Sequence, residues 1–258
     1  MVLKNLLLDR CLTNPQGQAA LAQFNLGYYF KPFQNALYGG DRFGCALTRE
    51  GNLAWYIADA TGHGEYGAKF WEQQAEIWNE LWQQFLQKSN PPEAIYELAR
   101  VFNEHLHQAI LSHSTLQTCL GIGVWSPSGQ LVFANFGYGT HILPQSSTNI
   151  WWMDQSDRIF GLKLGWLAPL QWANTPRAFI LHEVLDIQRL ILCTDSFLED
   201  DYRDPQQTLS MVKNMSHTSQ SLSFNAIIPY FLQHFPHEED DTTLVVIELN
   251  QGSAKKSL

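Results

Sequence analysis

The 258-residue chain lacks an apolar run of about 18 residues, the length that a membrane-spanning helix requires. The short run at residues 6–8 is followed at once by Asp9 and Arg10, so it is too short for a signal peptide or a membrane span. Basic residues are also scarce: 16 Lys and Arg face 25 Asp and Glu, which gives a net charge of −9. This balance argues against a nucleic-acid partner held through its phosphates. We therefore expect a cytoplasmic protein with neither a membrane nor a nucleic acid as partner.

Cysteine is rare, and its four copies show no CxxC or zinc-type spacing. Cys45, Cys119 and Cys193 lie inside apolar runs, which favours buried, reduced thiols over a chemical role. The chain also lacks internal repeats, low-complexity linkers and a clear domain break. Because 45% of its residues are hydrophobic, it can bury a sizeable core. We expect one domain over residues 1–250, with residues 1–20 as an N-terminal extension and 251–258 as a flexible tail.

The periodicity of apolar residues predicts many strands and two groups of helices. Helical spacing predicts helices over residues 65–87, 91–110, 206–214 and 222–234. Strands are predicted over residues 24–33, 43–48, 53–58, 119–125, 131–135, 139–143, 150–153, 178–184, 188–193 and 242–249. We expect the strands 119–125, 131–135 and 139–143 to form a meander. This order of elements favours an α+β fold, an α-β-β-α sandwich of two mostly antiparallel sheets with helices outside.

The helix predicted at residues 65–87 carries a stripe of tryptophans, Trp71, Trp78 and Trp82. Their helical spacing favours packing of this helix on a sheet. An exposed docking surface for a regulator or a second subunit is the alternative.

Four aspartates stand at the ends of predicted strands: Asp41, Asp59, Asp195 and Asp240. A carboxylate is costly to bury unless it is paired or bound to a cation. Strand-edge carboxylates from distant parts of the chain can converge between two sheets, and oxygen ligands of this kind suit Mg²⁺ or Mn²⁺. Each aspartate taken alone is also typical of a turn or a helix cap, so the residues by themselves leave a metal site and a structural role both open.

Two divalent ions held by such carboxylates are able to share a hydroxide and orient it at a phosphorus atom. The ions lower the pKa of that water and neutralise charge on the phosphoryl oxygens, so no covalent enzyme intermediate is required. The nucleophile is then a metal-bound water.

Several motifs resemble those of the PPM (type 2C) metal-dependent serine/threonine protein phosphatases, in particular the bacterial SpoIIE/RsbU-like branch. The resemblance extends from about Phe24 to Leu249 in order and spacing. Its motifs are Gly39-Gly40-Asp41, residues 57–64 (IADATGHG), residues 118–137, Phe160-Gly161-Leu162, residues 192–199 (LCTDSFLE) and residues 240–244 (DDTTL).

This resemblance implies a centre of two divalent metal ions, Mn²⁺ or Mg²⁺. Asp41 and Asp59 match its shared or adjacent ligands, the backbone carbonyl of Ala60 matches a further ligand, and Asp195 and Asp240 match the remaining carboxylates. The implied reaction is hydrolysis of phosphoserine or phosphothreonine on a protein. The usual substrate of this branch is a small phosphorylated anti-anti-sigma-like protein, and a separate regulatory partner would supply the input signal.

Three positions depart from the family pattern. Gly44 stands where an acidic residue is frequent, Ser196 replaces the glycine of the TDG motif, and Tyr138 stands where histidine is common. A serine at position 196 would be strained if the loop requires a positive φ. These departures leave the four carboxylates in place, and they bear on a third metal and on the catalytic rate.

Two further residues are candidates for roles in the reaction. His63 is a candidate proton donor to the leaving serine oxygen, because histidine titrates near neutral pH. Its alternative role is to fix the turn by hydrogen bonding. Arg42 is a candidate for binding the substrate phosphate, although neighbouring residues of a strand point to opposite faces.

The sequence therefore predicts a metal-dependent phosphoprotein phosphatase. A catalytically weak or inactive relative that binds a phosphoprotein as a regulator is the alternative, motivated by Gly44 and Ser196. A metal-free interaction scaffold would require all four aspartates to be turn residues.

Overall fold

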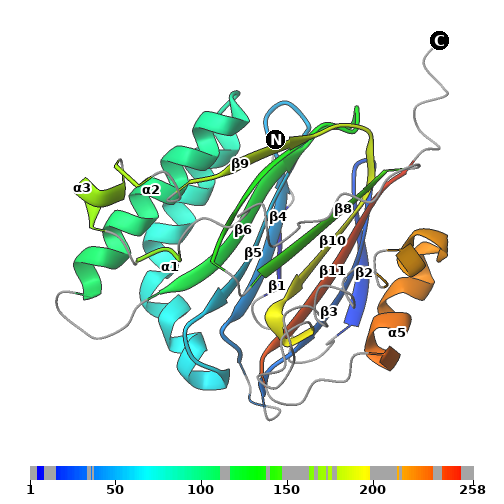
Figure 1. Cartoon of the computed structure of the whole chain (residues 1–258), viewed down its shortest axis with the longest axis horizontal. Coiled ribbons are helices and arrows are strands. Elements are labelled where there is room, and N and C mark those ends of the chain that lie inside the picture. Colours follow the sequence, from blue (N-terminus) through cyan, green and yellow to red (C-terminus); the bar gives the residue numbers. More distant parts are fainter. Residues whose placement is uncertain are drawn as a thin grey trace.

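The computed structural model describes residues 5–8, 16–33, 36, 38–110, 117–137, 140–146, 163–165, 168–172, 174–175, 179–197, 214, 217–234 and 240–250. Within this part of the chain, two antiparallel sheets pack face to face with helices on both outer faces, as Figure 1 shows. The predicted α-β-β-α sandwich is confirmed. No helix of the described residues combines the length and the hydropathy needed to cross a bilayer.

The two sheets have six and five strands in the described part of the chain. The first sheet has the order β1 (Asn5–Leu8), β4 (Asp41–Leu47), β5 (Leu53–Ala60), β6 (Thr118–Trp125), β7 (Leu131–Phe136) and β9 (Leu181–Val184). The second has the order β2 (Gln16–Leu21), β3 (Phe24–Lys31), β11 (Thr242–Leu249), β10 (Ile187–Thr194) and β8 (Thr140–Ser146).

The helices lie outside these sheets. The long helices α1 (Gly64–Gln87) and α2 (Pro91–Ile110), with the short α3 (Pro169–Trp172), lie over the first sheet (Figure 1). Helix α5 (Phe224–His234) lies over the second, and a 3-10 turn, η3 (Asp195–Phe197), follows β10. The predicted helices at 65–87, 91–110 and 222–234 are thus confirmed within two residues at their ends.

Three apolar layers hold the sandwich together, one between the sheets and one under each helical face. In the layer under α1, Trp71, Trp78 and Trp82 are 1%, 1% and 3% exposed. The ring of Tyr56 from β5 packs edge-on against Trp78 and Trp82, with centroids 4.8 and 5.0 Å apart. The tryptophan stripe is therefore helix-to-sheet packing, and the alternative of an exposed docking surface is wrong.

The predicted meander is wrong at its third strand. Strands β6 and β7 pair with each other, but β8 lies in the second sheet and pairs with β10. The chain crosses between the sheets after Gly137, whose φ of 79° suits glycine. Asn135 and Thr140 brace this crossing, since the Asn135 Nδ2 donates to the Thr140 carbonyl at 2.7 Å and the Thr140 hydroxyl donates to Asn135 Oδ1 at 2.6 Å. Apolar alternation predicted this strand but did not indicate its sheet.

The N-terminal residues contribute to both sheets. Strand β1 pairs with β4 in the first sheet, and β2 pairs with β3 in the second. This differs from the expected extension over residues 1–20, because residues 5–8 and 16–20 take part in the sandwich.

Some predictions concern residues outside the described part of the chain. These are the strand 150–153, most of the helix 206–214, the motif 160–162, Tyr138 and the tail 251–258. The prediction for the thiols can be checked at three positions: Cys45, Cys119 and Cys193 are buried and not in disulfides, as expected.

Candidate metal centre

The first two aspartates lie opposite each other on neighbouring strands. Asp41 at the start of β4 is in register with Asp59 near the end of β5. Phe43 and Ile57, two positions along the same strands, pack in the layer between the sheets. Because side chains alternate along a strand, Asp41 and Asp59 share that face. The sequence prediction that both face one site is consistent with this register.

The second sheet meets this pair at the same end of the sandwich. Thr194, the last residue of β10, donates its hydroxyl to Asp41 Oδ2 at 2.8 Å and accepts the Thr243 N–H at 2.9 Å. Asp195 follows Thr194 directly, and Asp240 lies two residues before β11. Because β10 and β11 pair with each other, all four aspartates come to one edge of the sandwich.

Asp41 is 1% exposed and lies among like charges. Burial raises the pKa of Asp41 well above its usual range, and the charges of Asp241 and Asp195 raise it further. Hydrogen bonds from Thr194 and Thr243 oppose this rise. The metal-free site thus holds an ionised Asp41 at a cost in free energy.

Asp59 shows the same electrostatic pattern. Burial raises its pKa well above the usual range, followed by the charges of Asp195, Asp41 and Asp240. The charge of Lys163 lowers it. The mutual repulsion indicates that the four carboxylates lie near one another.

The residues fit a hard divalent cation by their chemistry. Several buried carboxylates that destabilise one another are the donor set that Mg²⁺ and Mn²⁺ prefer, because a cation removes the repulsion. In the described part of the chain, however, no group of three His, Cys, Asp or Glu side chains is already gathered closely enough to hold an ion. The carboxylates are thus close enough to repel one another, but they do not surround a common point as the ligands of a bound ion would.

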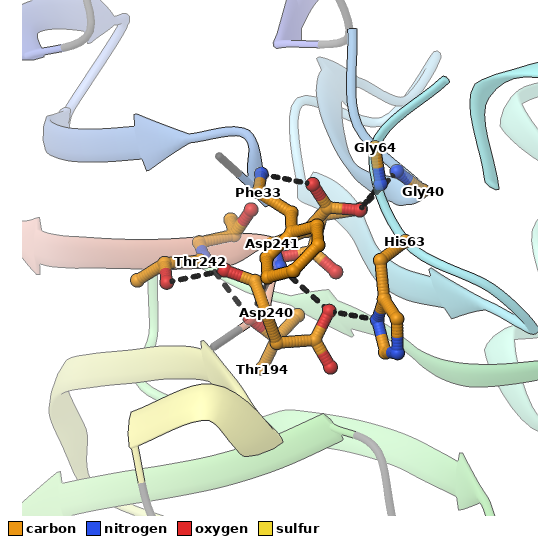
Figure 2. Close-up of polar contacts among 10 residues, drawn as sticks. Phe33, Gly40, His63, Gly64, Thr194, Asp240, Asp241 and Thr242 are labelled. Carbon is orange, nitrogen blue, oxygen red and sulfur yellow. Dashed lines mark hydrogen bonds and ion pairs between the residues drawn. The ribbon is translucent and has the colours of Figure 1, made fainter. Parts of the chain in front are cut away.

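His63 lies at the rim of this site, at the N-cap position of α1. Its Nδ1 is hydrogen-bonded to Asp240 Oδ1 (Figure 2). The His63 side chain is 54% exposed. Burial raises the pKa of Asp240, while His63 and the Asp241 N–H lower it. His63 makes no side-chain capping bond; its ring instead contacts a carboxylate 177 residues away and the ring of Phe33, with centroids 5.5 Å apart.

Asp241 is a structural residue of the site that the sequence analysis missed. Its carboxylate is 2% exposed and accepts three backbone N–H groups: Phe33 and Gly40 at 2.7 and 2.6 Å, and Gly64 at 2.9 Å. Figure 2 shows this side chain between the three donors. Gly64 begins α1, so the negative charge also lies favourably at a helix N-terminus. We call Asp241 with these three donors the Asp241 clamp.

The backbone after Asp59 is fixed by hydrogen bonds from two sides. The Thr118 hydroxyl donates to the Asp59 carbonyl at 2.8 Å, and the Ala60 N–H donates to the Gly40 carbonyl at 3.3 Å. The Ala60 carbonyl, a predicted metal ligand, lies beside Gly40. This segment is therefore held rigidly against the turn that carries Asp41.

Gly67 allows α1 to pack directly on both turns of the site. A Cβ at Gly67 would lie 2.4 Å from the Gly62 carbonyl oxygen and 2.5 Å from the Gly40 Cα. Both neighbours are backbone atoms, so neither can move aside as a side chain would. The glycine is required for this close approach, not for a special φ.

We expect Gly67→Ala to lower the free energy of unfolding by about 2 kcal/mol, because overpacking costs about 1–3 kcal/mol. In an ordinary helix the same change would stabilise by about 1 kcal/mol. The sign of the change therefore distinguishes the two cases, and urea unfolding measures it. Gln73→Ala, on the exposed face of α1, is the control and should change stability by less than about 0.5 kcal/mol. A Gly67→Ala protein as stable as wild type would contradict this packing.

The family model for stage II sporulation protein E (SpoIIE) matches residues 49–250. The chain belongs to the SpoIIE family. The match includes Asp59, Asp195 and Asp240 and begins after Asp41. No curated protein sequence matches the chain significantly.

Solved structures with low sequence identity share the fold. RsbX in complex with magnesium has a TM-score of 0.63 at 12% identity, over 91% of this chain and 99% of that one. The PP2C phosphatase domain and regulatory fragment of Bacillus subtilis SpoIIE gives 0.61 at 14%, over 91% and 65%. The RsbU and RsbW domains of a Mycobacterium tuberculosis protein give 0.63 at 15%, over 88% and 60%. This SpoIIE-family chain therefore has a PP2C-like phosphatase fold.

Two departures from the SpoIIE pattern have a local explanation. Gly44 faces α1, where a Cβ would lie 2.5 Å from the ring of Tyr56, so the aromatic ring occupies the space that a side chain would need. Ser196 is buried in η3, and in the described chain the non-glycine residues with positive φ are Ala22 and Asp186. The strain considered for Ser196 is therefore absent.

Arg42 lies on the opposite face of β4 from Asp41. Its guanidinium stands 4.9 Å from the ring centroid of Trp71 on α1, a cation–π contact. This contact gives no support to phosphate binding by Arg42, which stays a prediction.

Proposed function

We propose that this SpoIIE-family chain is a metal-dependent phosphatase that hydrolyses phosphoserine or phosphothreonine on a small regulatory protein of the anti-anti-sigma-like kind. What supports the proposal is the position of four aspartates at one edge of a phosphatase fold: Asp41 and Asp59 lie on β4 and β5, Asp195 directly follows β10, and Asp240 lies just before β11. The regulatory character of the similar structures, which include a cell-fate determinant and a stressosome system, motivates the choice of substrate.

Asp41, Asp59, Asp195 and Asp240, with the Ala60 carbonyl, would hold two Mn²⁺ or Mg²⁺ ions. Such ions supply an activated water and neutralise the charge on the phosphoryl group. Thr194 orients Asp41 by donating its hydroxyl, and Thr118 orients the backbone at Asp59. His63, half exposed beside Asp240, is positioned at the rim, where a proton donor to the leaving serine oxygen would be needed.

The proposal predicts hydrolysis of small phosphoesters and of a phosphoserine protein that depends on added Mn²⁺ or Mg²⁺. Asp195→Asn should lower kcat by about a thousandfold, because the charge stabilisation at stake is several kcal/mol and each 1.4 kcal/mol is tenfold. Phosphate release with and without metal measures both effects. Asp186→Asn, an exposed residue between β9 and β10, is the matched control and should retain activity. Absence of turnover with either metal on a panel of phosphoproteins would reject the proposal.

A catalytically inactive regulator that binds a phosphoprotein is the second candidate, and it rests on Gly44 and Ser196. Neither departure removes one of the four carboxylates, since Gly44 faces α1 and Ser196 lies beside Asp195 without strain. Calorimetric titration separates the two functions. Binding of the phosphoprotein without phosphate release would favour the regulator, and turnover with metal would reject it.

A further inference from the structure

Lys163 lies beside the carboxylates, and no motif in the sequence drew attention to it. Its neighbour Leu164 forms a bridge with Thr118, with backbone hydrogen bonds of 3.3 and 3.0 Å in the two directions. Thr118 begins β6, next to Cys119, which is in register with Asp59. The bridge therefore brings the 163–165 segment to the same edge of the first sheet as the metal centre.

The stem of Lys163 lies close to Cys119. Both Cys119 and Lys163 approach the backbone of Gly137: a Cβ added there would lie 2.6 Å from Cys119 Sγ and 2.8 Å from Lys163 Cγ. The thiol and the lysine stem therefore lie next to each other at that glycine. Cys119 faces the layer between the sheets, as Asp59 does. The half-buried lysine thus lies on the face that carries the carboxylates.

The ammonium group stays charged in this position. Cys119 and the carboxylates of Asp59 and Asp195 raise the pKa of Lys163, against the opposing effect of burial. Arg42, the earlier candidate for a phosphate ligand, lies on the other face of β4 against Trp71. Of these two basic residues, Lys163 therefore lies on the face that carries the carboxylates, and Arg42 does not.

We propose that Lys163 binds a phosphoryl oxygen of the substrate and of the phosphate product, and thereby positions the phosphoryl group at the metal centre. The proposal rests on the proposed phosphatase function. In the loaded site two divalent ions would neutralise the carboxylates of Asp41, Asp59, Asp195 and Asp240, while the Asp241 carboxylate is held by three backbone N–H groups. The Lys163 ammonium, which also contacts Cys119, is then able to pair with a dianionic phosphate, which an ammonium binds as a point charge.

Calorimetric titration of inorganic phosphate into the Mn²⁺-loaded protein tests this role without requiring turnover. Lys163→Gln should weaken phosphate binding about tenfold or more, the effect expected for a hydrogen bond to a charged group. Lys163→Arg should restore a large part of the affinity. With a phosphoprotein substrate, KM should rise more than kcat falls. Lys88→Gln, whose exposed lysine pairs with Glu97, is the control and should match wild type.

A purely structural role predicts different results. If Lys163 only neutralises the carboxylates, Lys163→Gln will tighten Mn²⁺ binding and leave phosphate affinity within twofold of wild type, which would overturn the proposal. A wild-type protein that binds Mn²⁺ and phosphate without turnover would reject the phosphatase function, yet the loss of affinity in Lys163→Gln would still support the phosphate site. A loaded wild-type protein that does not bind phosphate would overturn the role of Lys163.

Discussion

Replacing Asp241 by alanine is expected to lower the free energy of unfolding by about 3–4 kcal/mol. The change leaves the N–H groups of Phe33, Gly40 and Gly64 without their common acceptor, a loss that outweighs the relieved repulsion between Asp241 and Asp41. An unsatisfied buried donor costs about 1–3 kcal/mol, and solvent reaches the part-buried Phe33 more easily than the two glycines. Urea unfolding of the metal-free protein measures the loss.

The Asp241 clamp also joins the segment after β3, the turn before Asp41 and the start of α1. Its loss should therefore weaken Mn²⁺ affinity by about 10- to 100-fold, the range for groups that orient metal ligands. Asp241→Asn keeps one acceptor oxygen, so it should lose about half as much stability. Glu72→Gln, an exposed charge on α1, serves as the control. An Asp241→Ala protein within 1 kcal/mol of wild type would contradict the role of the clamp.

Asp41→Asn is expected to have opposite effects on activity and on the stability of the metal-free protein. Activity should fall about a thousandfold, because the variant loses a proposed metal ligand. Without metal the variant should be more stable than wild type, since it removes a buried charge from a repulsive cluster and keeps an oxygen to accept the Thr194 hydroxyl. Thermal unfolding with and without Mn²⁺ measures the second effect.

The pH dependence of this gain has a definite sign. The pKa of Asp41 is raised in the folded protein, so the folded state binds the proton more tightly than the unfolded state. Ionised Asp41 destabilises the metal-free folded protein fully above the raised pKa, and this destabilisation is relieved as the pH falls through that pKa. The advantage of Asp41→Asn in the absence of metal should thus be largest at alkaline pH and should shrink on acidification.

Asp186→Asn removes the same charge at the opposite end of β10 and should show no such pH dependence. A metal-free Asp41→Asn protein less stable than wild type at alkaline pH would contradict the repulsion. Equal stabilisation of both proteins by Mn²⁺ would show that Asp41 is not a ligand.

The helices and strands in which apolar residues recur at a regular spacing could be predicted from the sequence. Helix α1 is recognisable from its tryptophan stripe, and the pairing of Asp41 with Asp59 follows from a hairpin about Gly51. Both signals are local, because they depend on side chains a few residues apart. The position of β8 is not local: its alternating pattern suits either sheet, and the Asn135–Thr140 bracing that accompanies the crossing is formed only in the folded chain.

Asp241 and Lys163 could not be recognised from the sequence for the same reason. Asp241 receives donors from Gly40 and Phe33, more than 200 residues away, and in sequence it is simply the second residue of an Asp-Asp pair. Lys163 is an isolated lysine whose importance depends on a two-residue bridge to Thr118. No spacing rule predicts contacts over such separations, whereas motifs that are compact in sequence were found.

The pairing of β3 with β11 has a consequence for how the protein folds. These strands join residues 24–31 to residues 242–249, so the second sheet has to close a loop of more than 200 residues. Closing such a loop is entropically costly and slows folding. During synthesis, the helices and the first sheet are able to form while the second sheet still lacks its central strand. Asp240 and Asp241 directly precede that strand, so the candidate metal centre is complete only after β11 has been synthesised, and a product truncated before β11 would carry an incomplete site.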